Sequence, residues 1–147
     1  MKIMTLRSTM MILAGLLLLL PGQLSAQGIT KEVREVAGFT AIDAGGAFDI
    51  YLGQAEKTEV VVETEAANME KVLTRVNNGT LEISSKGIKN TDKLNVYVTI
   101  PQIESIDIHG AASLEGLTSL KGTELKIRAS GASDARLEVY FDQLETD

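Results

Sequence analysis

A pattern of one apolar residue followed by small residues four and five positions later recurs along most of the chain. It is clearest in IDIHGA, which begins at Ile106, and in IRASGA, which begins at Ile127. Aligned in this way, the pattern begins at Ile42, Val62, Ile83, Ile106 and Ile127, in steps of 20, 21, 23 and 21 residues. Repeats of about 20 to 50 residues are typical of solenoids and arrays, in which successive units lie on one another.

About 21 residues per unit would suit a coil of short strands, each rising roughly 3.3 Å per residue, joined by tight corners. The isoleucines would then stack inside, and the small residues would stack at a corner where larger side chains leave no room. The sequence therefore predicts a β-solenoid. A two-sheet sandwich is the alternative, because a pattern this loose can also recur in a Gly-rich β protein that has no repeat. The predicted structural repeat consists of Ile42, Gly46, Ala47, Ile106, Gly110, Ala111, Ile127, Gly131 and Ala132.

The dominant periodicity is two, which is typical of half-buried strands. Apolar residues alternate in AFDIYLG (47–53) and in KLNVYVTI (93–100), and Asn78-Gly79 predicts a hairpin turn because both residues tolerate positive φ. AANMEKVL (66–73) is the one helical candidate, about two turns long. The chain is therefore predicted to be all-β, with at most one short helix.

The first 26 residues have the composition of a signal peptide. Lys2 and Arg7 precede an apolar run of eleven residues from Met10 to Leu20, which Pro21 ends. That run is shorter than the roughly 20 residues that cross a bilayer as a helix. We therefore expect residues 1–26 to be removed and residues 27–147 to form a single β domain without a membrane span. The expected location is the periplasm, the outer membrane surface or the medium.

Composition excludes several classes of function. Two of the 14 basic residues and none of the 20 acidic residues lie in 1–26, so residues 27–147 carry a formal charge of −8. An acidic chain is unsuited to nucleic acid, whose phosphates need Lys and Arg. The absence of cysteine excludes disulfides and thiol nucleophiles. We predict no cofactor, no metal site and no catalytic residue, although the single histidine, His109, could act as a base if Asp107 oriented it.

Four stretches carry a resemblance to a known family: FTAIDAGGAFDIYLGQ, VVVETEAANMEKVLTRVNNGTLEIS, KLNVYVTIPQIESIDIHGAASLEG and LKIRASGASDARLEV. Together they resemble the "putative auto-transporter adhesin, head GIN domain" family of exported bacterial proteins. The resemblance covers nearly all of residues 35–147 and implies a right-handed, β-helix-like stack and a role in surface adhesion. Two features depart from the family: His109 replaces the usual Ser, and only two Ser-Gly-Ala-like units are present.

The C-terminal end is expected to be an uncapped coil. A sixth start of the pattern would fall near position 148, just beyond Asp147, so we expect the domain to be incomplete there. An open coil would offer unpaired backbone groups to another strand and so permit self-association.

Three functions fit these observations. The first is a non-catalytic exported domain that attaches to a surface glycan or an envelope protein. The second is a structural element that assembles through its open end. The third is an enzyme that acts on polysaccharides, because the chain is rich in carboxylates.

Overall fold

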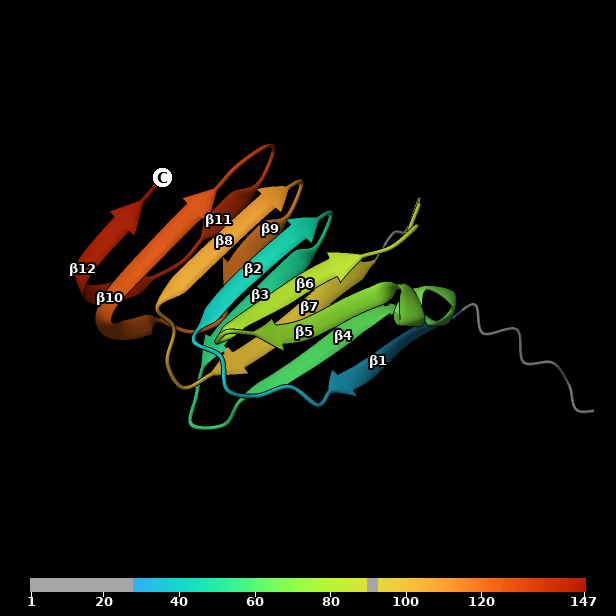
Figure 1. The fold of residues 1–147 in the computed structure, drawn as a ribbon, viewed down its shortest axis with the longest axis horizontal. Coiled ribbons are helices and arrows are strands. Elements are labelled where there is room, and N and C mark those ends of the chain that lie inside the picture. Colours follow the sequence, from blue (N-terminus) through green and yellow to red (C-terminus); the bar gives the residue numbers. More distant parts are fainter. Residues whose placement is uncertain (1–27, 90–92) are drawn as a thin grey trace, which may run out of the picture.

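The computed structural model describes residues 28–89 and 93–147, which form two six-stranded sheets and one short helix (Figure 1). Sheet A has the order β1 (Ile29–Arg34), β4 (Glu59–Glu65), β7 (Leu94–Ile100), β3 (Asp49–Gln54), β9 (Ser113–Gly116) and β11 (Asp134–Arg136). Sheet B has the order β12 (Val139–Thr146), β10 (Leu120–Ala129), β8 (Ser105–Gly110), β2 (Ala41–Gly46), β6 (Thr80–Ser85) and β5 (Val72–Asn77). The helix is a 3₁₀ segment, η1 (Ala66–Lys71), in the stretch where the sequence predicts one.

The hydrophobic core lies between the two sheets. Alternation of apolar and polar residues gives each strand one buried face, as in β3, where Ile50 and Leu52 are at most 1 % exposed. Phe48, immediately before β3, is fully buried in the same cluster. The hairpin between β5 and β6 turns at Asn78-Gly79, where φ is 48° and 75°, as the sequence predicts.

The predicted right-handed β-solenoid is wrong, although the all-β class with one short helix is confirmed. Both sheets are mixed, because β1 pairs antiparallel with β4, β4 with β7, and β5 with β6. The strand order also departs from chain order: β2 lies between β6 and β8, and β3 between β7 and β9. The error arises at Val62, which lies on antiparallel β4 of sheet A, whereas the other four pattern starts lie on sheet B.

The residues of the predicted structural repeat lie mainly in sheet B. Ile42, Ile106 and Ile127 occupy one register across the parallel strands β2, β8 and β10. Gly46 is in register with Gly110, and an added Cβ at Gly110 would lie 3.1 Å from the backbone of Gly46. Three small residues are exposed just beyond these strands: Ala47, Ala111 and Ala132.

Gly131 gives a direct test of the backbone contact between these turns. Its φ is +76°, and an added Cβ would lie 2.6 Å from the carbonyl oxygen of Gly110. Gly38 has a φ of +77° but no atom within 4 Å of an added Cβ. We expect Gly38→Ala to lower the free energy of unfolding by about 1 kcal/mol through backbone strain alone. Gly131→Ala should lower it by about 1–3 kcal/mol more, because it adds overpacking to the same strain. Urea denaturation measures both, and equal losses would contradict the contact.

Candidate functional site

The outer face of sheet A, which points away from the core, carries two rows of side chains across the strands. Alternate residues of each strand share a face, so residues in register on neighbouring strands form rows across the sheet. One row is polar, and the other contains two tyrosines and two valines. The polar row runs Lys31, Glu63, Asn95, Asp49, Ser113 and Asp134. The second row runs Val33, Val61, Tyr97, Tyr51, Glu115 and Arg136.

Glu63 is the centre of a polar network on this face. Its side chain is 9 % exposed and accepts a hydrogen bond from the Tyr97 hydroxyl at 2.7 Å. Lys93 Nζ lies 3.0 Å from its other carboxylate oxygen, and Lys31 Nζ lies 4.0 Å away. Asn95 Nδ2 donates to it at 3.4 Å. The hydrogen bonds from Tyr97 and Lys93 hold the pKa of Glu63 below its ordinary value.

The two tyrosines stack on each other. The Tyr51 and Tyr97 ring centroids are 4.9 Å apart with an interplanar angle of 16°, and Lys31 Nζ lies 5.0 Å from the Tyr97 centroid. Burial raises the pKa of Tyr51, and the nearby carboxylate of Asp49 adds to the effect. The rings therefore cover one another, which makes them supports of the face rather than an open platform for a flat sugar.

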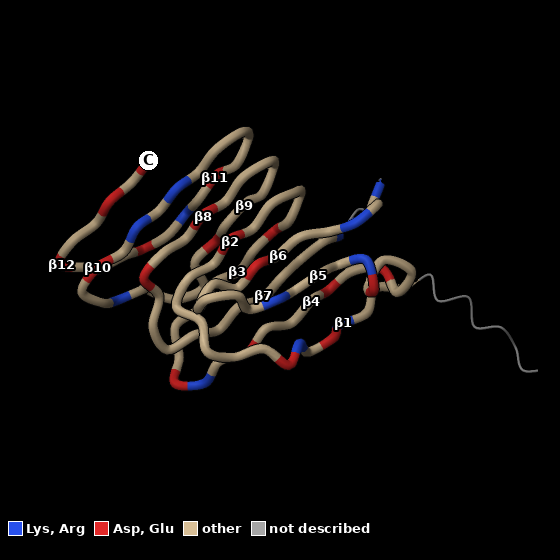
Figure 2. The backbone as a smooth tube through the Cα atoms, viewed as in Figure 1, with Lys and Arg blue, Asp and Glu red and all other residues tan. Residues whose placement is uncertain are grey.

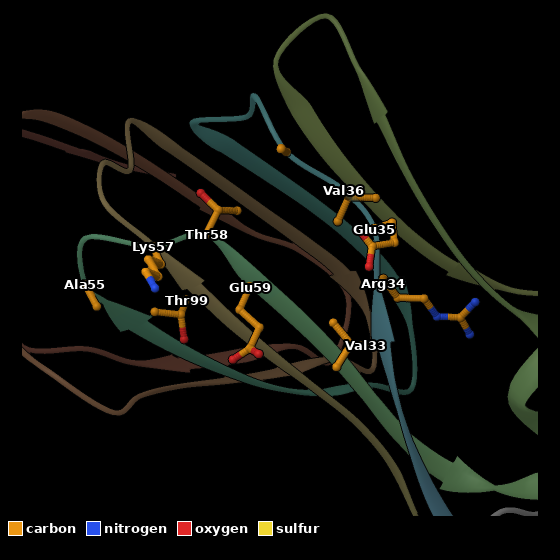
Figure 3. A pocket seen from close by; sticks show the side chains of 10 residues that line it. Val33, Arg34, Glu35, Val36, Ala55, Lys57, Thr58, Glu59 and Thr99 are labelled. Carbon is orange, nitrogen blue, oxygen red and sulfur yellow. The ribbon is translucent and has the colours of Figure 1, made fainter.

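A cavity of about 430 Å³ lies on the same face at the β1 end of the sheet, and we call it the edge cavity (Figure 3). Its walls come from the end of β1 and the segment after it, the β3–β4 connection, and the end of β7. Figure 3 shows the side chain of Arg34 pointing away from the space. The cavity is lined by Val33, Arg34, Glu35, Val36, Ala37, Ala55, Lys57, Thr58, Glu59 and Thr99.

Three charged side chains at the edge cavity have no ion pair or hydrogen bond within the described ranges 28–89 and 93–147. They are Glu35, Lys57 and Glu59. Arg34, by contrast, pairs with Glu32 at 3.0 Å. All three residues are exposed, so a partner can reach their charges.

A second cavity, of about 570 Å³, lies between the β7–β8 connection and β10. There Glu104 accepts hydrogen bonds from Thr40 and Gln102, and Lys126 pairs with Glu145. Three of its polar side chains, Gln102, Glu104 and Lys126, are thus engaged within the fold, so we take the edge cavity as the better candidate for binding.

His109 is oriented differently from the prediction that paired it with Asp107. Its Nε2 lies 3.1 Å from the Asp43 carboxylate on the neighbouring strand β2, and both side chains are about half exposed. The ring packs over Gly45, where an added Cβ would lie 2.0 Å from His109 Cε1. In the part of the chain that the structure describes, no group of three acidic or histidine residues is placed to hold a metal ion.

No sequence motif predicts the edge cavity. Its walls come from residues 33–37, 55–59 and 99, which share no motif, and sheet pairing alone brings them together. Sequence reasoning also missed Glu63, because in VVVETE (60–65) it alternates like any outer-face acid and nothing distinguishes it from Glu65.

Comparison with known proteins places the chain in a family. The family described as "putative auto-transporter adhesin, head GIN domain" matches residues 38–147. The chain belongs to this family. A search of curated proteins finds no match.

Solved structures of three adhesin-like proteins share the fold. A putative adhesin from Bacteroides fragilis has a TM-score of 0.76 at 21 % identity, with 82 % of this chain and 58 % of that chain covered. One from Parabacteroides distasonis has a TM-score of 0.76 at 23 % identity, with 81 % and 52 % covered. One from Parabacteroides merdae has a TM-score of 0.65 at 21 % identity, with 81 % and 58 % covered. The present chain thus spans little more than half the length of these proteins.

The hydrogen bond from Tyr97 to Glu63 predicts a pH-dependent loss of stability. Because the pKa of Glu63 is lowered in the folded chain, its ionised form stabilises the fold above the ordinary value of 4.5. This stabilisation is lost as the pH falls through the folded pKa. Tyr97→Phe should lower the free energy of unfolding by about 1 kcal/mol at pH 7, and by less as the pH falls below the ordinary value.

Tyr51→Phe is the matched control for this substitution. The Tyr51 hydroxyl makes no hydrogen bond within residues 28–89 and 93–147, so its removal should change stability little. Urea unfolding at a series of pH values compares the two variants. A Tyr97→Phe effect that stays constant from pH 7 to pH 3 would rule out the coupling to Glu63.

Proposed function

We propose that this chain is an exported, non-catalytic attachment domain that binds its partner through the edge cavity. The observation that carries the proposal is the presence there of three charged side chains without partners in the described residues: Glu35, Lys57 and Glu59. Family membership supports an adhesin-like role in general. A cavity of about 430 Å³ falls within the 300–1,000 Å³ range of ordinary binding sites.

The proposal includes export and a domain of residues 27–147. Its support is the sequence of residues 1–26, in which Lys2 and Arg7 precede an apolar run of eleven residues that ends at Pro21. These residues lie outside the described part of the chain. Within residues 28–89 and 93–147 no helix is long and apolar enough to span a bilayer. The proposed location is the periplasm, the outer membrane surface or the medium, and the proposed partner is a surface glycan or an envelope protein.

Retention on isolated bacterial envelopes tests the attachment role. The purified chain should be retained, and Lys57→Ala combined with Glu59→Ala should weaken retention roughly tenfold, because each lost charge pair costs up to about 1 kcal/mol. Glu124→Ala, at the second cavity, is the control and should bind like the wild type. Equal weakening in both variants would refute the edge cavity as the binding site.

The purified chain should also leave oligosaccharides uncut.

A second candidate function is self-assembly through β12. This strand pairs only with β10 in the described residues, and two of its large side chains, Tyr140 and Leu144, are 57 % and 51 % exposed. An exposed strand edge with apolar side chains is a template for pairing with another chain. On this proposal, the molar mass measured by light scattering rises with protein concentration, and Leu144→Lys abolishes the rise. A constant monomer mass at millimolar concentration would exclude it.

A further inference from the structure

One hydrogen-bonding edge of β1 is unpaired in the described residues, because β1 pairs only with β4 at the end of sheet A (Figure 1). The Ala66 N–H donates to the Gly28 carbonyl at 3.2 Å, which fixes the phase of the antiparallel ladder. Bonded and non-bonded pairs alternate along such a ladder. The residues bonded to β4 are therefore Thr30, Glu32 and Arg34. The backbone groups of Ile29, Lys31 and Val33, which alternate with the bonded residues, face the free edge.

The residues whose backbone faces the free edge also place their side chains on the outer face of sheet A. They are Ile29, Lys31 and Val33, opposite Glu65, Glu63 and Val61. Ile29 is 46 % exposed and Val33 56 % exposed, and they are two of only five exposed large hydrophobic residues in the described chain. The edge thus presents an apolar, basic, apolar series together with free N–H and C=O groups.

A second copy of this chain fits the β1 edge poorly. An antiparallel pair of β1 strands that covers the apolar residues would set Ile29 opposite Val33 of the second copy. That register would place Lys31 directly opposite Lys31 of the second copy, and like charges in that position are destabilising. Lysine on an edge strand is a known device against self-pairing. A strand that carries an acidic residue at the central position would instead gain an ion pair there.

Lys31 can turn toward such a partner by giving up two long contacts, with the Glu63 carboxylate and with the Tyr97 ring at 5.0 Å. It lies 4.0 Å from Glu63 and its side chain is 61 % exposed. Glu63 has closer partners in Lys93, at 3.0 Å, and the Tyr97 hydroxyl, at 2.7 Å. Loss of the Lys31 contact would therefore leave the buried carboxylate of Glu63 paired.

We infer that β1 accepts an extended protein segment of the pattern apolar-x-acidic-x-apolar as an added antiparallel strand. Backbone hydrogen bonds at Ile29, Lys31 and Val33 would supply affinity, and the alternate side chains would supply specificity. Val33 also lines the edge cavity, so a residue just beyond the added strand would reach that space. This inference rests on the proposed attachment function and narrows its partner to a protein.

Hydrogen exchange with a synthetic peptide tests the geometry. The probe is Thr-Val-Thr-Glu-Thr-Val-Thr, added to the full chain at millimolar concentration. We expect the amide exchange of Ile29, Lys31 and Val33 to slow at least tenfold, while the amides of β12, an edge strand of sheet B, stay unchanged. Protection on β12 but not on β1, or on neither strand, would overturn the inference.

A charge-swap cycle tests the proposed ion pair between Lys31 and the glutamate of the peptide. Lys31→Glu should reduce binding of the probe several-fold, and the same peptide with Lys in place of Glu should restore it. Val33→Pro should remove binding, since it deletes an N–H at the free edge and spares the bonds to β4. Leu144→Asp, on β12, is the matched surface control, and thermal melting verifies that each variant folds. Wild-type affinity in both β1 variants, or no rescue by the swapped peptide, would refute the assigned edge.

Protease treatment of envelopes separates this inference from the proposed function. If a protein strand is the partner, retention of the chain disappears after the envelopes are digested. Retention that survives digestion would overturn the inference and leave attachment, to a glycan, in place. Envelopes that fail to retain the chain before digestion contradict the attachment function itself.

Discussion

The close approach of the backbone at the turns after β2, β8 and β10 is the constraint on which the rest of sheet B depends. The Ala111 N–H donates to the Gly46 carbonyl at 3.0 Å, and the Ala132 N–H to the Gly110 carbonyl at 2.8 Å. Gly46, Gly110 and Gly131 have φ values of 124°, 82° and 76°, which residues with a Cβ rarely adopt. These contacts hold three parallel strands in register. The register in turn aligns their isoleucines in the core.

The antiparallel strands at the other end of the molecule create the candidate site. Because β1 runs antiparallel to β4, the end of β1 lies beside the start of β4, and the segment after β1 meets the β3–β4 connection. The network around Glu63 holds β1, β4 and β7 together on the outer face. The edge cavity and the free edge of β1 thus adjoin β4 and β7, whose inner faces pack in the hydrophobic core.

The sequence predicts the strands better than it predicts their pairing. Period-two alternation finds β3 and β7, and Asn78-Gly79 finds the β5–β6 turn, because these signals are local. Sheet membership is not local. Val62 matches the spacing of the isoleucines, yet it lies in the other sheet on an antiparallel strand. For the same reason, proximity in sequence suggested Asp107 as the partner of His109, whereas strand register supplies Asp43 from β2.

Charge disfavours pairing between two copies of the exposed β1 edge. Figure 2 shows acidic and basic residues spread over many strands rather than gathered in one patch. The formal charge of −8 on residues 27–147 makes copies of the domain repel one another. Lys31 adds a local repulsion between two β1 edges, while it attracts an acidic residue on another strand. The same side chain therefore disfavours pairing with a second copy and favours pairing with a chosen partner, which is how specificity arises at an edge whose backbone would accept any strand.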